Sequence, residues 1–154
     1  MKEVKVESFK VIGLSIRSTN ENMQAAQDIG ALWGRFMGEG IADKIPNKSA
    51  EDIYCLYTNY EGDATKPFDV ILGCKVSTDK TVPPDMVAHT CHGGTYTPFI
   101  SKGDLTQGKV IGETWMEIWK KNLDRNYSTD FEVYGKRAQN PKDAEVDIFI
   151  AINP

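Results

Sequence analysis

What this sequence lacks excludes several classes of protein. None of its apolar runs approaches the roughly 20 residues that a helix needs to cross a bilayer. Residues 1–5 are charged but are not followed by an apolar signal segment, so we expect a cytoplasmic protein without membrane contact. The sequence also lacks a glycine-rich phosphate loop and a serine nucleophile elbow. With two histidines, acid–base catalysis by histidine has few candidates.

Positive charge is in the minority. The 154 residues carry 18 Lys and Arg against 22 Asp and Glu, a net charge of −4. Such a balance repels phosphate backbones and anionic membranes. We therefore expect no direct binding to nucleic acid.

Cysteines are few, and they suggest neither disulfides nor a metal centre. Cys55, Cys74 and Cys91 are odd in number and lie in apolar, strand-like segments, which predicts reduced core residues. His89, Cys91 and His92 form a cluster that resembles metal ligands, but alternation along a strand turns residue 92 away from the other two. We expect no metal and no cofactor.

The residues that are present predict one domain over 1–154, because 40% apolar content is enough for a core. Residues 4–16 have a strand-like pattern broken at Gly13, and a capping box at residues 18–21 predicts a helix that runs to Gly38. Two β-branched and aromatic runs then predict a hairpin of residues 53–60 and 68–76.

A second series of elements follows. The proline-containing residues 77–84 read as a joint, and residues 86–99 read as a strand broken at Gly93 and Gly94. Residues 111–119 predict a helix with one apolar stripe, and the chain closes with a strand pair at 130–137 and 145–152.

The order strand, helix, strand, strand therefore occurs twice. IGALW at residues 29–33 also parallels IGETW at residues 111–115. Together these features predict an α+β fold made of two repeats, about residues 1–78 and 84–154, related by pseudo-twofold symmetry. In this arrangement each helix covers one face of its strands, and the two sheets meet at a seam with a central ligand cleft.

Glu132 is the residue whose surroundings are most unusual for a charge. It lies between Phe131 and Val133 and is followed by Tyr134. It is either a solvated strand carboxylate or the counter-charge for a lipophilic cation, which aromatic rings would bind by cation–π attraction. Three Trp and six Tyr are available for such a wall.

The tryptophans lie on the predicted helices. Trp33 and Trp115 have core spacing, whereas Trp119 lies at the edge of its stripe and could lean towards the cleft. The hairpin strand at residues 53–60 is apolar or aromatic on both of its faces. One face packs on the core, so we expect a ligand pocket or a partner to cover the other.

These motifs resemble a known family. GGTY at residues 93–96, DFEVY at 130–134 and VDIFI at 146–150 resemble the GyrI-like effector-binding domains. The first half is similar more narrowly to the integron-associated effector-binding proteins of that group, through IGALW at residues 29–33 and IYCLYTNYE at 53–61. The resemblance spans nearly the whole chain and depends on the order and spacing of the motifs.

The resemblance implies a duplicated fold whose central cleft binds amphipathic, often cationic, compounds, with Glu132 as counter-charge. The candidates for the aromatic wall are Tyr134, Tyr57, Trp119, Phe99 and Tyr96. In many relatives the domain is fused to a helix-turn-helix activator. Here the two repeats use up the chain, so we expect a stand-alone protein that works as a homodimer or through a separate regulator.

Three functions remain open at this point. The first is a binding module for drug-like cations. The second is a hydrolase that opens strained electrophilic rings, with Glu132 activating water. The third is an inhibitor that binds another protein. We rank the binding module first.

Overall fold

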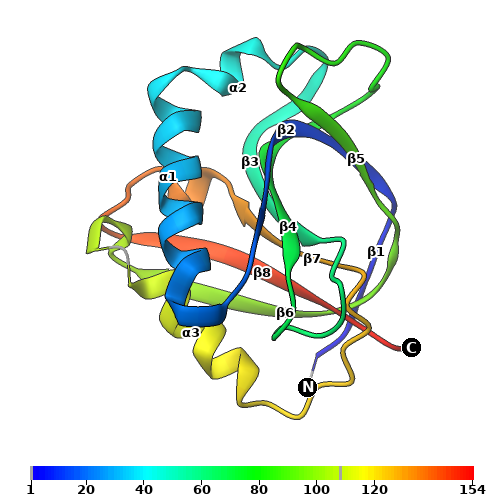
Figure 1. The fold of residues 1–154 in the computed structure, drawn as a ribbon, viewed down its shortest axis with the longest axis vertical. Helices are drawn as coiled ribbons and strands as arrows, with labels where there is room; N and C mark the ends of the chain where they lie inside the picture. The colour runs from blue at the N-terminus through cyan, green and yellow to red at the C-terminus, as the bar shows by residue number, and fades with distance from the viewer. Residues whose placement is uncertain (1, 108) are drawn as a thin grey trace.

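The chain folds into one curled antiparallel sheet with helices on one of its faces. The computed structural model describes residues 2–107 and 109–154 (Figure 1). The eight strands lie in the order β1-β6-β8-β7-β3-β4-β2-β5. Among the described residues, no helix is long and apolar enough to span a membrane.

The elements follow the predicted order. The first half consists of β1 (Val4–Val6), β2 (Phe9–Ser18), the 3-10 turn η1 (Glu21–Met23), α1 (Gln24–Gly38), the short α2 (Ile41–Lys44), β3 (Lys48–Thr58) and β4 (Phe68–Val76). The second half consists of β5 (Val87–Cys91), β6 (Gly94–Gly103), η2 (Leu105–Gln107), α3 (Val110–Trp119), β7 (Thr129–Tyr134), η3 (Lys136–Ala138) and β8 (Ala144–Ile152).

Two predicted boundaries are wrong in the first half. The break in the first strand falls between Val6 and Phe9, not at Gly13. The capping box is also wrong, because Ser18 still belongs to β2 and its hydroxyl donates to Asp28 Oδ2 at 2.7 Å. The chain instead enters α1 through Met23, whose φ of 62° is left-handed.

The sheet is curled because each edge strand continues along the chain into the strand beside the opposite edge: β1 runs on into β2, which pairs with β5, and β5 runs on into β6, which pairs with β1. At the first edge Val6 pairs with Gly94, and at the second edge Phe9 pairs with Cys91, so the register continues across both breaks. β1 and β2 thus act as one bent strand, and β5 and β6 as another.

Aromatic contacts on one face confirm the curl. β2 and β7 are separated by β3 and β4 in the sheet order, which would place them about 14 Å apart if the sheet were flat. The Phe9 and Phe131 rings nevertheless lie 5.2 Å apart. This side is therefore the inside of the curl. We call it the inner face, and its buried residues are Phe9, Val11, Leu56, Ile71, Cys91, Tyr96, Phe131 and Ala151.

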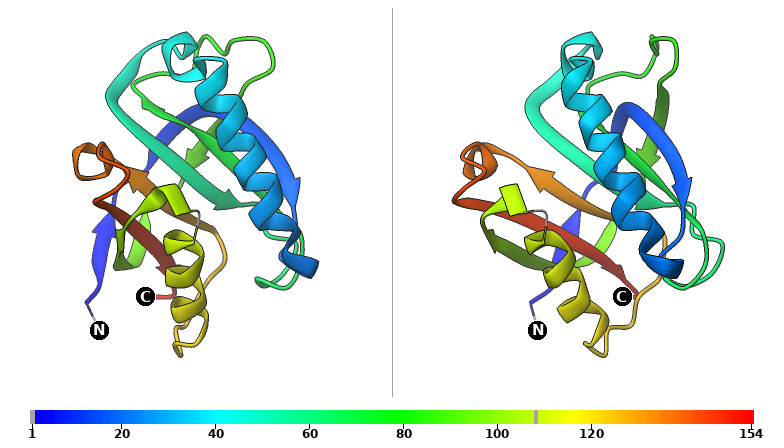
Figure 2. Two further views of the ribbon diagram at one scale, coloured as in Figure 1. Left: turned by 90° about the vertical axis from the view of Figure 1, so that its left-hand side faces the viewer. Right: turned by 60° about the vertical axis from the view of Figure 1, so that its left-hand side comes forward.

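The opposite side of the sheet is the helix face. α1 and α3 both lie over it, as Figure 2 shows. α1 contributes Leu32 and Phe36 to the main core, and α3 contributes Trp115 and Ile118. The sheet curls on itself and so buries its second face, where the sequence led us to expect a ligand or partner as the main cover.

Backbone contact is closest where β2 crosses β4. Gly13 pairs with Gly73, and a Cβ built on Gly13 would lie 2.1 Å from the backbone oxygen of Leu72. Only glycine fits at this crossing, so Gly13 permits the close approach within a continuous strand rather than breaking it.

A single sheet replaces the two sheets that the sequence predicted. β3 pairs with β7 in the middle, with β4 and β2 outside β3 and with β8 and β6 outside β7. The seam is thus a hydrogen-bonded strand pair. The hairpin prediction is confirmed, since β3 and β4 pair from Ile53–Cys74 to Thr58–Asp69. The cysteine prediction is also confirmed: Cys55, Cys74 and Cys91 are buried and free.

Candidate functional site

Glu132 lies on the helix face, in the middle of the sheet, and its side chain is 1% exposed. Three side chains donate hydrogen bonds to it. Tyr57 Oη and Trp115 Nε1 donate to Oε2 at 2.7 and 2.6 Å, and Tyr134 Oη donates to Oε1 at 2.6 Å. Both carboxylate oxygens therefore have partners, as a buried charge requires.

The strand register brings these groups together. Glu132 pairs with Cys55 on β3 and with Ile148 on β8, so apolar side chains flank it. Tyr57 and Tyr134 lie two residues from this row, on the same face, because side chains alternate along a strand.

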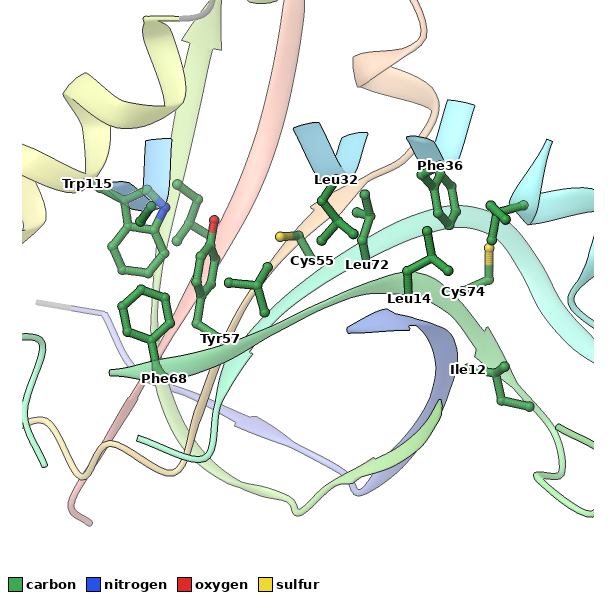
Figure 3. Close-up of a cluster of buried hydrophobic side chains, with 14 of the residues drawn as sticks. Ile12, Leu14, Leu32, Phe36, Cys55, Tyr57, Phe68, Leu72, Cys74 and Trp115 are labelled. Carbon is green, nitrogen blue, oxygen red and sulfur yellow. The ribbon is translucent and has the colours of Figure 1, made fainter. Parts of the chain in front are cut away.

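Trp115 approaches Glu132 from α3, which lies over the helix face of the sheet. It lies on the buried side of α3, and its ring lies 5.1 Å from that of Tyr57, nearly edge to face. Figure 3 shows the two rings beside each other, next to Phe68. A helix residue with a core position thus supplies a donor to the carboxylate.

Burial and hydrogen bonding act in opposite directions on Glu132. Burial raises the pKa of its carboxyl group, and the hydrogen bonds from Tyr134, Trp115 and Tyr57 lower it, with a net rise above the ordinary value of 4.5. Within the described residues no basic side chain pairs with Glu132. Its charge is hydrogen-bonded but not neutralised.

Asp130, two residues earlier on the same face, is a contrasting case. Its side chain is also buried, but Arg125 Nη2 forms an ion pair with Oδ2 at 2.7 Å. Tyr60 Oη donates to the same oxygen, and the backbone N–H of Ala151 donates to Oδ1. Asp130 therefore has a resident counter-charge and Glu132 does not.

Trp33 packs against Tyr134 beside this site, and we call this pair of residues the cover. Their rings lie 4.7 Å apart, nearly edge to face, and both side chains are partly exposed. Trp33 comes from α1 and Tyr134 from the end of β7, so the cover joins an element of each half of the chain.

The structure brings some of the predicted wall residues to Glu132 and not others. Tyr57 and Tyr134 touch it. Phe99 lies on the helix face, two strands away, opposite Ile148. Trp119 ends α3 and is 47% exposed. Tyr96 belongs to the inner face, because it is out of phase with Phe99 along β6, and its hydroxyl donates to the Thr129 carbonyl at 3.0 Å.

Sequence reasoning missed Trp115 and Trp33 as members of the site. Both have core spacing, and Trp115 is indeed buried, at 8% exposure. The signal that could have revealed Trp115 is chemical: a buried indole N–H needs an acceptor, and a buried carboxylate needs donors. Neither requirement identifies the partner until the position of α3 over β7 is known. Trp33 gave no such signal, because it is partly exposed and contacts Tyr134.

The His89, Cys91 and His92 cluster is divided in the structure. His89 Nε2 lies 3.2 Å from Thr58 Oγ1, while Cys91 Sγ contacts the Tyr96 hydroxyl at 3.5 Å. Across the part of the chain that the structure describes, no group of three His, Cys, Asp or Glu residues could hold a metal ion.

This α+β fold agrees with the GyrI-like effector-binding type that the sequence resembles. The profile of the integron-associated effector binding protein family, Cass2, matches residues 4–152. The chain belongs to that family.

Individual relatives support the assignment. The Bacillus subtilis protein YobU, a candidate transcriptional regulator, is 30% identical over 146 residues, which cover 91% of this chain and 89% of YobU. The Vibrio cholerae integron cassette protein VCH_CASS2 has a solved structure with a TM-score of 0.75 and 32% identity, covering 99% of this chain and 95% of that one.

A more distant structure shares the fold. SAV2435, solved bound to tetraphenylphosphonium, superimposes with a TM-score of 0.79 at 15% identity, over 99% of this chain and 93% of its own.

Proposed function

We propose that this protein binds amphipathic, cationic, drug-like compounds on its helix face, with Glu132 as the counter-charge. The observation that carries the proposal is a fully buried carboxylate with three neutral donors and no basic partner in the described residues. Burying such a charge costs free energy, and a ligand cation would recover part of that cost.

The surroundings suit a lipophilic cation. Tyr57, Tyr134 and Trp115 present ring surfaces beside the carboxylate, and a cation against such rings gains about 0.5 to 2 kcal/mol. SAV2435, which has the same fold, is bound to tetraphenylphosphonium, a cation of this chemistry. The proposed contacts are Glu132, Tyr57, Tyr134, Trp115 and Trp33, with Phe99 and Trp119 at the margin.

Ligand access requires movement of the cover. Glu132 is 1% exposed, so Trp33 and Tyr134 must separate before a cation can reach it. Tyr134 is the donor that can leave, because it is partly exposed, whereas Tyr57 and Trp115 are buried and keep Oε2 oriented. The bound state thus replaces one hydrogen bond by a charge pair.

The proposal also covers the domain organisation of the protein and its partners. We infer one domain of two repeats, about residues 1–78 and 84–154. The matching strand orders on either side of the β3–β7 pair support this inference. The excess of acidic residues supports action without direct DNA contact. We infer that the protein works as a homodimer or with a separate regulator.

The test compares Glu132→Gln with the parent protein by calorimetry. Tetraphenylphosphonium should bind the variant about tenfold to a hundredfold more weakly, the equivalent of roughly 1.4 to 2.8 kcal/mol. A neutral triaryl compound, triphenylphosphine oxide, should bind both proteins equally, because glutamine keeps the shape and removes the charge.

Glu51→Gln is the matched control. It removes the same charge from the same sheet, but the Glu51 side chain is 85% exposed. We expect unchanged affinity. Equal binding of the cation to Glu132→Gln and to the parent would rule out the counter-charge. If a strained-ring electrophile is consumed only when Glu132 is present, as product analysis would show, the protein is a hydrolase instead.

A further inference from the structure

The inner face contains an aromatic pocket that the cation site does not use. Its volume is about 430 Å³, within the range of small-molecule sites. It opens at the end of the curl where β1 meets β2. Its walls include Phe9, Tyr54, Phe131 and Phe149, from four different strands.

These rings form a continuous apolar wall. Phe131 stacks on Phe149, with 4.8 Å between the ring centroids and 21° between the ring planes. The centroid of the Phe9 ring lies 5.4 Å from that of Tyr54 and 5.2 Å from that of Phe131. Phe9 and Phe131 are buried, while Tyr54 and Phe149 are partly exposed towards the opening. The nearly parallel Phe131 and Phe149 rings suit a planar aromatic ligand stacked on them, and Phe9, inclined at 73° to Phe131, would meet such a ligand edge to face.

The charges at the opening distinguish ligand classes. Lys75 Nζ lies 5.5 Å from the centre of the Phe9 ring, and Lys75 forms no ion pair among the described residues. Asp147 also lines the pocket, but Arg137 pairs with it. Glu7 is exposed, so water screens its charge.

A ligand anion at this opening would therefore gain the unpaired ammonium of Lys75. Lys75 would repel a ligand cation. The buried carboxylates of Asp130 and Glu132 could not attract it here, because both lie on the helix face and accept hydrogen bonds there. The inner pocket thus prefers the opposite charge to the one we propose for the helix face.

We propose that the inner face is a second binding site, for planar aromatic monoanions, with the ring system against Phe9, Tyr54, Phe131 and Phe149 and the anionic group at Lys75. The site is independent of Glu132, because side chains on the two faces of a strand point in opposite directions. It goes beyond the proposed function and does not depend on it.

The experiment uses the dye 8-anilino-1-naphthalenesulfonate, an aromatic monoanion with a planar naphthalene ring system, whose fluorescence rises in apolar surroundings. The folded protein should bind one equivalent saturably at about 0.15 M salt, where long-range repulsion by the net charge is screened. Lys75→Gln should weaken binding about tenfold, the effect expected for loss of one charge-assisted contact.

Two controls separate charge from shape. Lys102→Gln removes the same charge from an exposed position on β6 and should leave the affinity unchanged. The neutral relative N-phenyl-1-naphthylamine should bind the parent and Lys75→Gln alike. Urea unfolding of each variant checks that the dye reports a folded protein.

A third control separates the two sites. Glu132→Gln should not change dye affinity, and tetraphenylphosphonium should not displace the dye. Displacement by the cation, equal losses in Lys75→Gln and Lys102→Gln, or absence of saturable binding would each overturn the proposal. Dye binding that weakens as protein concentration rises would show that a second copy of the chain covers the opening, and would overturn it as well.

Discussion

Asp130 and Glu132 show how one partner changes the role of a buried carboxylate. Both lie on the helix face of β7, and burial raises the pKa of each. For Asp130 the ion pair with Arg125 opposes the rise, so its charge is neutralised within the protein. Glu132 depends on hydrogen bonds from neutral groups. We therefore infer a structural role for Asp130, whereas Glu132 remains the proposed counter-charge for a ligand.

Substitution at these two residues should have opposite effects on stability. Asp130→Asn leaves the Arg125 guanidinium buried without its anion, and we expect a loss of about 3 to 5 kcal/mol in the free energy of unfolding. Glu132→Gln removes an uncompensated charge and should leave stability unchanged or higher. Urea unfolding of both variants without ligand measures the difference. A large loss in Glu132→Gln would mean that its carboxylate is structural.

The raised pKa of Glu132 predicts a pH dependence of cation binding. As pH falls through this pKa, the carboxylate is protonated and loses its charge at a higher pH than an exposed glutamate would. Affinity for tetraphenylphosphonium, whose charge is independent of pH, should therefore weaken on acidification. Calorimetry from neutral to mildly acidic pH measures the change, and Glu132→Gln should show a flat profile.

Protein stability has the opposite dependence at this residue. Because the folded-state pKa lies above the unfolded one, the contribution of Glu132 to stability is present below the unfolded pKa and is lost as pH rises through the folded pKa. The ligand-free protein thus carries a cost at neutral pH, which supports the view that a cation completes the site.

Among the elements, β7 and α3 show what sequence patterns could predict. The pattern at residues 130–137 predicted the strand β7, and the core spacing of Trp115 correctly predicted its burial on α3. Neither pattern contains the contact between Trp115 and Glu132, because it depends on where α3 lies over a strand from another part of the chain.

Glycines at different positions should respond differently to alanine. A Cβ at Gly13 would meet the Leu72 carbonyl oxygen at 2.1 Å, so Gly13→Ala should cost about 3 kcal/mol as β2 and β4 are forced apart. Gly34, in the middle of α1, has nothing within 4 Å of its Cβ position, and Gly34→Ala should stabilise by about 0.5 to 1 kcal/mol. Thermal unfolding compares the two. Equal effects would show that β2 and β4 can relax.

At the scale of the molecule, the sequence predicted the order of the elements and the fold class, but not the single sheet. Element order depends on local periodicity, which one sequence displays. The pairing of β3 with β7 and of β2 with β5 depends on contacts between distant segments, which leave no local pattern. The curl that buries the inner face follows from those long-range pairings. The sequence alone therefore suggested that a ligand or a partner covers this face.

The closure of the sheet has a consequence for the order in which the protein folds. β3 and β4 are joined by a short connection, whereas Phe9 and Cys91 pair across more than half of the chain. Because joining distant segments costs more entropy, hairpins form earlier than such pairings. Pulsed hydrogen exchange during refolding should protect the amides of β4 that bond to β3 before those of β2 that bond to β5, and simultaneous protection would contradict this order. β2 thus precedes both of its partners along the chain but completes its pairing with β5 late in folding.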